Sequence, residues 1–166
     1  AFRRYVLGRF AAAAGIVVLF TLVNTIVNPL AVTPTPWSDP GFRDYRPIYR
    51  YQRTAKAGLL RSEPWDAVFL GSSRVDIALD PELPAWGDTR AVNLALSAGT
   101  LPEAAAMFDY GAERQDIKLA IVGIDLADLT GRFSVMHTAG FMESPLNRDG
   151  DKIERELRYY SGISTF

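Results

Sequence analysis

An uncharged, apolar run from Phe10 to Val27 constrains this chain more than any other part of its sequence. A helix rises 1.5 Å per residue, so this run would reach roughly 27 Å, close to the thickness of a bilayer's hydrocarbon core. A buried helix of a soluble protein and a cleavable signal peptide are the alternative interpretations, which the length disfavours. We therefore expect residues 1–30 to form a short flank and one transmembrane helix in membrane lipid.

The charges beside this run predict its orientation. Arg3, Arg4 and Arg9 lie on its N-terminal side, and the positive-inside rule places such a flank in the cytoplasm. The basic residues from Arg43 to Lys56 lie mostly beyond the short flank on which the rule acts. The sequence therefore predicts a single-pass protein of the inner (cytoplasmic) membrane with a cytoplasmic N-terminus and a periplasmic domain.

Two stripes of residues at helical spacing predict contacts within the membrane. One stripe is small and consists of Gly8, Ala11, Ala12 and Gly15. The other is polar, lies on a different face and consists of Thr21, Asn24, Thr25 and Asn28. Small residues let a second helix approach closely, and polar groups are costly against lipid. Both stripes are candidate contacts with transmembrane helices of a larger complex; an equal alternative is that Asn24 and Asn28 mark the outer membrane interface.

The composition excludes several functions. The 166 residues carry a net charge of -1, so the basic excess of a nucleic-acid-binding protein is missing. Without cysteine there is no disulfide, thiolate zinc site or iron–sulfur cluster. The sequence has no Walker lysine and no G-x-G-x-x-G motif, and its carboxylates at Asp76, Asp80, Asp125 and Asp128 are scattered. We therefore expect no nucleic-acid partner, no cofactor and no metal.

A proline-rich segment separates the predicted membrane helix from a domain. Residues 31–46 include Pro34, Pro36 and Pro40, which favour an extended stalk. Residues 47–166 alternate apolar strands with helical patterns, which predicts an α/β fold with a parallel sheet. The expected strands, each buried on both faces, are 66–70, 91–96 and 118–124. Three strands are few for this class, and the sequence begins without methionine, so we expect the domain to continue past Phe166.

Local signals predict the helices of this domain, over 47–60, 101–114 and 151–160. Thr100 and Glu103 form a T-x-x-E capping box at the start of the second helix. Asp149 is the candidate cap of the last helix. The basic residues of the first helix are expected to face solvent or anionic headgroups; they are Arg50, Arg53 and Lys56.

Polar blocks follow all three predicted strands, where ligands bind in parallel sheets. They are Gly71-Ser72-Ser73-Arg74, Ser97-Ala98-Gly99-Thr100 and Gly123-Ile124-Asp125. From Asp66 to Asp128 these blocks resemble the SGNH (GDSL-like) hydrolase family, in particular its membrane-anchored extracytoplasmic members that act on cell-envelope polymers. The resemblance implies a partial flavodoxin-like (SGNH-like) three-layer α/β domain with a parallel sheet.

The resemblance also implies roles for individual residues. Ser73 matches the family's nucleophile, Gly99 its oxyanion-binding glycine, and Asp125 the position of an asparagine in the oxyanion hole. Ser72 replaces the family's usual aspartate, and an ionised Asp125 cannot donate a hydrogen bond to an oxyanion. The family's D-x-x-H block, which supplies the catalytic base, is absent from the sequence, and the single histidine, His137, is interpreted as a loop residue.

Two functions stay open at this level. The first is an esterase or acyltransferase-like protein acting on an envelope polysaccharide, with Ser73 attacking the ester and a base supplied from beyond Phe166. The second is a non-catalytic accessory subunit of a larger membrane complex, respiratory or photosynthetic, docked through its transmembrane helix. The first polar block is explained nearly as well by an ordinary strand-to-helix turn in which serine caps the next helix.

Overall fold

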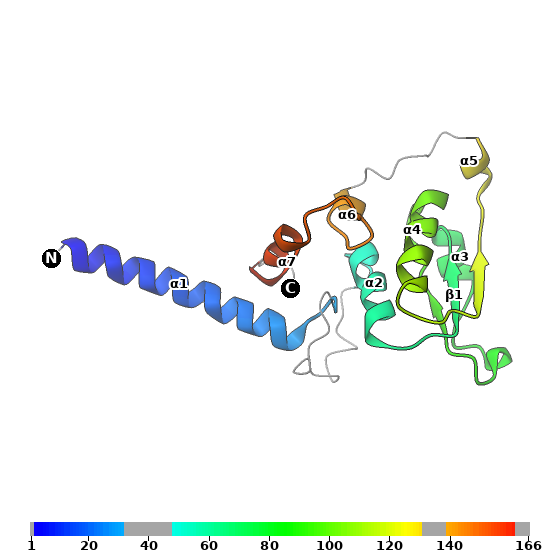
Figure 1. The fold of residues 1–166 in the computed structure, drawn as a ribbon, viewed down its shortest axis with the longest axis horizontal. Coiled ribbons are helices and arrows are strands. Elements are labelled where there is room, and N and C mark those ends of the chain that lie inside the picture. Colours follow the sequence, from blue (N-terminus) through cyan, green and yellow to red (C-terminus); the bar gives the residue numbers. More distant parts are fainter. Residues whose placement is uncertain (1, 32–47, 131–138, 162–166) are drawn as a thin grey trace.

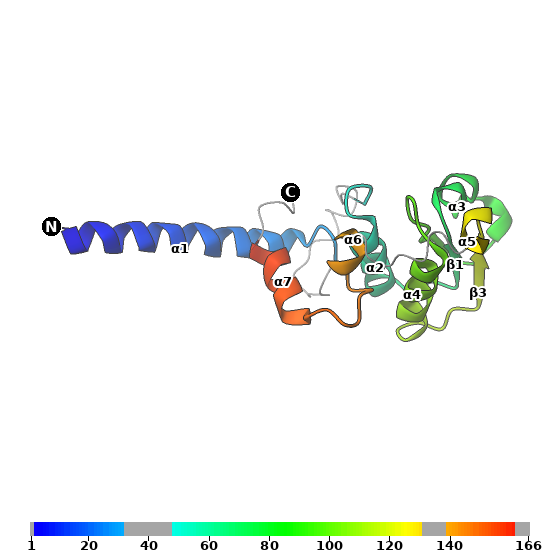
Figure 2. The same ribbon diagram turned by 90° about the horizontal axis from the view of Figure 1, so that it is seen from above.

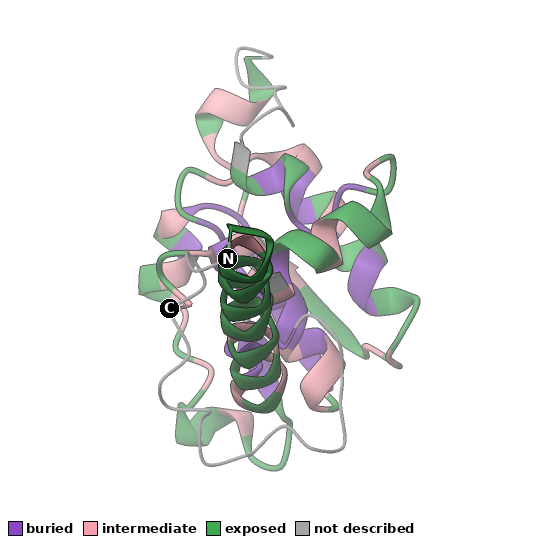
Figure 3. Ribbon diagram, turned by 90° about the vertical axis from the view of Figure 1, so that its left-hand side faces the viewer, coloured by how far each residue is buried: buried purple, intermediate pink, exposed green. Residues whose placement is uncertain are grey.

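The computed structural model describes residues 2–31, 48–130 and 139–161 (Figure 1). Helix α1 (Phe2–Val27) extends away from the other elements (Figure 2). A view along this helix shows its residues exposed over most of its length, with the buried residues grouped behind it (Figure 3). α1 includes the whole predicted apolar run and is long and apolar enough to cross a membrane.

Three short strands form a parallel sheet in the order β2-β1-β3. β1 (Ala67–Leu70) is central, with β2 (Ala91–Asn93) on one side and β3 (Leu119–Val122) on the other. The register aligns the first residues of all three strands. The predicted α/β class and parallel sheet are confirmed, although each strand is shorter than expected.

One face of the sheet is covered by α2 (Gln52–Ser62) and α4 (Leu101–Ala112). Leu60 of α2 and Met107 of α4 pack with Val68 of β1 in the larger of the two clusters that adjoin the sheet. The short helix α6 (Ala139–Met142) adds Phe141 to this cluster. Burial of these side chains, at about 25 cal/mol per Å² of apolar surface, holds the helices on the sheet.

The opposite face of the sheet is covered by α3 (Ser73–Ala78) and a 3-10 turn, η2 (Pro84–Trp86). The rings of Phe69 and Trp86 lie with their centroids 5.0 Å apart. Val75 of α3 packs into the same cluster. Helical elements therefore bury both faces of β1, which accounts for its uninterrupted apolar sequence.

β3 contradicts the prediction that every strand is buried on both faces. Leu119 is 43% exposed and Val122 is 44% exposed, whereas all of β1 is buried. β3 is one of the two edge strands of the described sheet, so its outer side lacks a neighbouring described strand, and unlike the other edge strand, β2, it is mostly exposed. A short helix, α5 (Leu126–Leu129), follows it and is also exposed.

The helix caps were predicted in part. The capping box at α4 is confirmed: the Glu103 N–H donates to the Thr100 hydroxyl over 3.4 Å, and the Thr100 N–H donates to Glu103 Oε2 over 3.2 Å. The last helix, α7, spans Lys152–Ser161. Its first N–H groups are satisfied by Asp151, whose Oδ1 accepts from Ile153 over 2.8 Å. The prediction of Asp149 as the cap is wrong, because the helix starts two residues later than that assignment requires.

The C-terminal end of α1 is built into the domain. Leu30 is buried, and its N–H donates to the Tyr159 hydroxyl over 2.9 Å. Arg61 of α2 donates from Nε to the Ala31 carbonyl over 2.7 Å. The expected stalk, residues 31–46, lies outside the described residues except for Ala31. The domain nevertheless meets the helix end directly at Leu30 and Ala31.

The polar stripe of α1 has partners within this chain. Asn24 is fully buried, and its Nδ2 donates to the Tyr160 carbonyl of α7 over 2.8 Å. Asn28 is buried and accepts at Oδ1 from a tyrosine hydroxyl of α7 over 3.5 Å. The hydroxyls of Thr21 and Thr25 donate to carbonyls one turn earlier in α1. The stripe therefore has partners within this chain, and its contact with a helix of another protein stays a prediction.

The small stripe of α1 contacts no other described element. Gly8, Ala11, Ala12 and Gly15 are exposed. A Cβ atom built on Gly8 or Gly15 would meet nothing within 4 Å among the described residues. Contact of this face with another transmembrane helix stays a prediction.

The basic residues of α2 do not form the exposed surface that the sequence predicts. Arg53 makes two hydrogen bonds to the fully buried Glu103 carboxylate, at 2.6 and 2.9 Å. Lys56 is buried and contacts Asp76 over 2.5 Å. Arg50, which precedes the helix, stays exposed. A buried charge requires a partner, and Arg53 and Lys56 each pair with a carboxylate distant in the sequence.

Candidate functional site

The three polar blocks predicted from the sequence lie together at the carboxyl edge of the sheet, and we call them the strand-end site. It consists of residues 71–74, 97–100 and 123–125. The Leu96 N–H donates to the Gly71 carbonyl over 2.9 Å, and the Gly123 N–H donates to the Leu70 carbonyl over 2.8 Å. These bonds continue the sheet beyond its regular strands and bring the blocks side by side.

Three glycines allow the blocks to touch through their backbones. A Cβ atom on Gly71 would lie 2.8 Å from the Gly123 carbonyl oxygen, and one on Gly99 would lie 2.9 Å from the Gly71 carbonyl oxygen. Gly71 also adopts a φ of 141°, which L-residues rarely adopt. The glycines of the resemblance therefore have a clear packing role at this edge.

The two serines of the first block differ in their surroundings. Ser72 is buried and precedes α3, where its hydroxyl oxygen accepts from the Arg74 N–H over 3.3 Å. Ser73 is the first residue of α3 and is half-buried. The capping interpretation of this block thus holds for Ser72, while the Ser73 hydroxyl is the more accessible of the two.

Asp125 forms an ion pair across the site. Its Oδ1 lies 2.6 Å from Arg74 Nη1. A hydrogen bond from Ser72 and, to a smaller extent, one from Arg74 lower the pKa of the Asp125 carboxyl below its usual value. The side chain is therefore ionised at neutral pH, and an ionised carboxylate accepts hydrogen bonds but donates none. Asp125 in this arrangement would oppose the negative charge of an oxyanion.

The remaining predicted groups do not complete a hydrolytic site in the described residues. The Gly99 N–H donates to the Leu96 carbonyl over 2.9 Å, so it is already engaged. His137 lies outside the described residues. The described part of the chain also contains no group of three or more His, Cys, Asp or Glu residues able to hold a metal ion.

Two residues of α2 hold the strand-end site in place, and the sequence reasoning missed both. Lys56 Nζ donates to Asp76 of α3 and also to the Ala95 carbonyl over 2.6 Å. Gln52 Oε1 accepts from the Ser97 N–H over 2.6 Å. Burial lowers the pKa of Lys56, and Asp76 opposes that shift. The only sequence signal is that Gln52 and Lys56 stand one helical turn apart.

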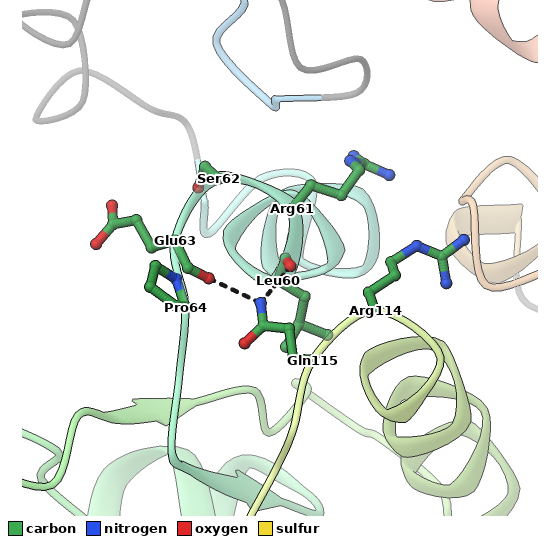
Figure 4. Close-up of a pocket in the computed structure, with 7 residues that line it drawn as sticks. All are labelled: Leu60, Arg61, Ser62, Glu63, Pro64, Arg114 and Gln115. Atoms are coloured by element: carbon green, nitrogen blue, oxygen red, sulfur yellow. Dashed lines mark hydrogen bonds between the residues drawn. The ribbon is translucent and has the colours of Figure 1, made fainter.

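A shallow hollow of about 440 Å³ lies away from this edge, between the ends of α2 and α4 (Figure 4). Gln115 crosses it, donating from Nε2 to the carbonyls of Leu60 and Glu63 and accepting at Oε1 from the Trp65 N–H. In Figure 4 the guanidinium of Arg61 points away from Gln115. The polar atoms of Gln115 join two elements of the fold, so this hollow offers no chemistry.

No protein-family model, curated protein or solved structure matches this chain.

Proposed function

We propose that this chain is a membrane-anchored accessory protein whose SGNH-like α/β domain binds a partner protein along the edge of β3. α1 anchors it in the inner membrane with its N-terminus in the cytoplasm, and the domain lies in the periplasm. The partner belongs to a larger membrane complex. This is the second of the two functions that the sequence leaves open.

The exposed edge of β3 carries this proposal. Leu119 and Val122 are exposed on opposite faces of the strand, and Ile124 continues the apolar surface beyond it. Leu126 and Leu129 of α5 are exposed next to it along the chain. Strands of parallel sheets are normally covered on both faces, and a bare apolar edge strand is a site for pairing with another strand.

The backbone of β3 fits the addition of a strand. The N–H groups of Leu119 and Gly123 donate toward β1, to Asp66 and Leu70. Residues of a parallel strand alternate between its two neighbours, so Ala120 and Val122 direct their N–H and C=O groups to the open edge. A partner strand would gain main-chain hydrogen bonds here and apolar contacts on both faces.

The strand-end site supports a role without hydrolysis. Asp125 is ionised and paired with Arg74, and the Gly99 N–H is engaged with Leu96. Stabilising the oxyanion of an acyl-transfer reaction requires donors directed at it. Neither group is such a donor in this conformation.

One observation favours the esterase or acyltransferase function as a second candidate. Ser73 is the first residue of the helix that follows the buried strand β1 and the positive-φ turn at Gly71, and it is half-buried. A fluorophosphonate probe distinguishes the two functions. It would modify Ser73 if the chain is an esterase or acyltransferase, and it would leave Ser73 unmodified if the chain is a non-catalytic accessory protein. The variant Ser73→Ala is the control for labelling at other positions.

The edge-pairing proposal predicts that Val122→Pro separates the chain from its partner. Proline removes an outward N–H and is tolerated on the open side of an edge strand, so the bonds to β1 survive. We expect co-purification of partner proteins from mildly solubilised native membranes to fall by about tenfold or more, equivalent to roughly 1.4 kcal/mol. The matched control is Val122→Thr, which keeps the N–H and a β-branched side chain.

Two results would contradict this proposal. One is recovery of the unmodified chain only as a free monomer. The other is unchanged co-purification of Val122→Pro when its near-ultraviolet circular dichroism shows the native fold. As a further control on the fold, Leu119 must be as exposed in the Val122→Pro variant as in the parent. Limited proteolysis at the edge of β3 would check this exposure.

A further inference from the structure

We propose that helix α7 lies in the membrane–water interface and inserts its apolar side between lipid headgroups. The proposal rests on the anchoring of α1 in the membrane, but it assigns a separate lipid-binding surface. That surface consists of Ile153 and Leu157, one helical turn apart on α7.

α7 separates apolar from charged side chains around its axis. Ile153 is 70% exposed and Leu157 is 63% exposed, although both are large and apolar. On another side of the helix Arg158 and Glu154 form an exposed ion pair at 2.6 Å. A helix with one apolar side and one charged side typically lies in the plane of a membrane surface, its apolar side buried roughly 5–10 Å into the lipid.

The position of α7 against α1 matches the expected height of that surface. The Tyr160 carbonyl accepts from Asn24 over 2.8 Å, and both views of the fold show α7 beside the C-terminal part of α1 (Figure 1, Figure 2). The apolar run from Phe10 to Val27 rises roughly 27 Å, close to the thickness of the hydrocarbon core, and Asn24 lies in its last turn. α7 therefore contacts α1 close to the point where that helix leaves the hydrocarbon.

The surroundings of α7 favour lipid as the occupant of this surface. Leu22, Val23 and Ile26 of α1 are exposed in the same stretch that contacts α7, so lipid around the anchor would lie beside α7. Lys152 and Arg158 are exposed and each pairs with a glutamate of α7, so these charges belong to its water-facing side. The anchor already brings lipid to this height, whereas a protein partner would first have to displace it.

The absence of cysteine makes a direct test simple, because a single introduced cysteine carries the only label. The variants Ile153→Cys and Leu157→Cys, each spin-labelled, would be reconstituted as the full chain in vesicles of phosphatidylcholine and phosphatidylglycerol. Collision of the label with oxygen, which is enriched in lipid, is compared with collision with a water-soluble nickel chelate. Leu19→Cys in α1 is the lipid control, and Ile77→Cys, strongly exposed on α3, is the water control.

We expect the labels at positions 153 and 157 to show an oxygen-to-nickel collision ratio several-fold above that of the Ile77→Cys label. A ratio equal to that water control, with the Leu19→Cys label in lipid, would overturn the assignment of α7 and leave the anchor intact. Protection from both reagents would overturn it too, because protein would then cover the surface. A Leu19→Cys label in water would instead contradict the anchoring by α1.

Discussion

Replacing Glu103 with alanine will lower the free energy of unfolding of this protein by about 3–5 kcal/mol. The Glu103 carboxylate is fully buried and makes two hydrogen bonds to Arg53. It also accepts from the Thr100 N–H in the capping box of α4. The substitution leaves the Arg53 guanidinium largely buried without its carboxylate, which costs more than the pair itself contributes.

Thermal unfolding in detergent, followed by tryptophan fluorescence, measures this effect as a fall of about 10 °C in the midpoint. Glu113→Ala is the matched control, because Glu113 caps the opposite end of α4 and pairs with Arg114 and Arg148 at the surface. Exposed pairs contribute about 0–1 kcal/mol, so this variant should unfold close to the parent. Equal midpoints for the two variants would show that the Arg53–Glu103 pair does not hold α2 to α4.

Replacing Gly71 with alanine is the second change with a large expected effect, a loss of about 2–6 kcal/mol in the free energy of unfolding. A φ of 141° is strained for an L-residue, which costs about 1–3 kcal/mol. The added methyl group would lie 2.8 Å from the Gly123 carbonyl oxygen and 2.9 Å from Val75 Cγ2, and such overpacking adds about 1–3 kcal/mol. The blocks of the strand-end site would have to move apart.

Gly87→Ala separates the two causes. Gly87 also has a positive φ, 57°, but a Cβ atom there would meet nothing within 4 Å. Among the described residues only backbone strain acts at that position, where ψ is -126°, so we expect a loss of about 1–3 kcal/mol. Urea unfolding of both variants checks the difference. A Gly71→Ala protein as stable as Gly87→Ala would contradict the close backbone contact between β1 and β3.

The parts of the fold that follow from short stretches of sequence were predictable. The capping box of α4 involves residues three positions apart, and its two hydrogen bonds are present. The parallel sheet followed from alternation of apolar strands with helices, and parallel strands necessarily bring their carboxyl ends to one edge. Convergence of the polar blocks after β1, β2 and β3 was therefore accessible before any coordinates.

The remaining features depend on residues far apart in the chain. Arg53 meets Glu103 across 50 positions, and Asn24 meets Tyr160 across 136. Residue type and spacing assign a basic residue to the surface unless its distant partner is known. The same limit applies to β3, because an apolar strand has the same sequence pattern at the edge of a sheet as at its centre. The ion pair of Asp125 with Arg74 likewise joins residues 51 positions apart.

The direction of the strands relative to α1 determines how a molecule reaches the strand-end site. In Figure 1, β3 leads to α5 at the top of the view while α1 extends to the left, so the sheet runs across the direction of the anchor. A helix that spans a bilayer lies on average about 20° from the membrane normal. With α1 anchored as proposed, the strand-end site then opens sideways at the end of the molecule far from α1 (Figure 1, Figure 2). A molecule would reach it from the solvent, at a distance from the bilayer surface.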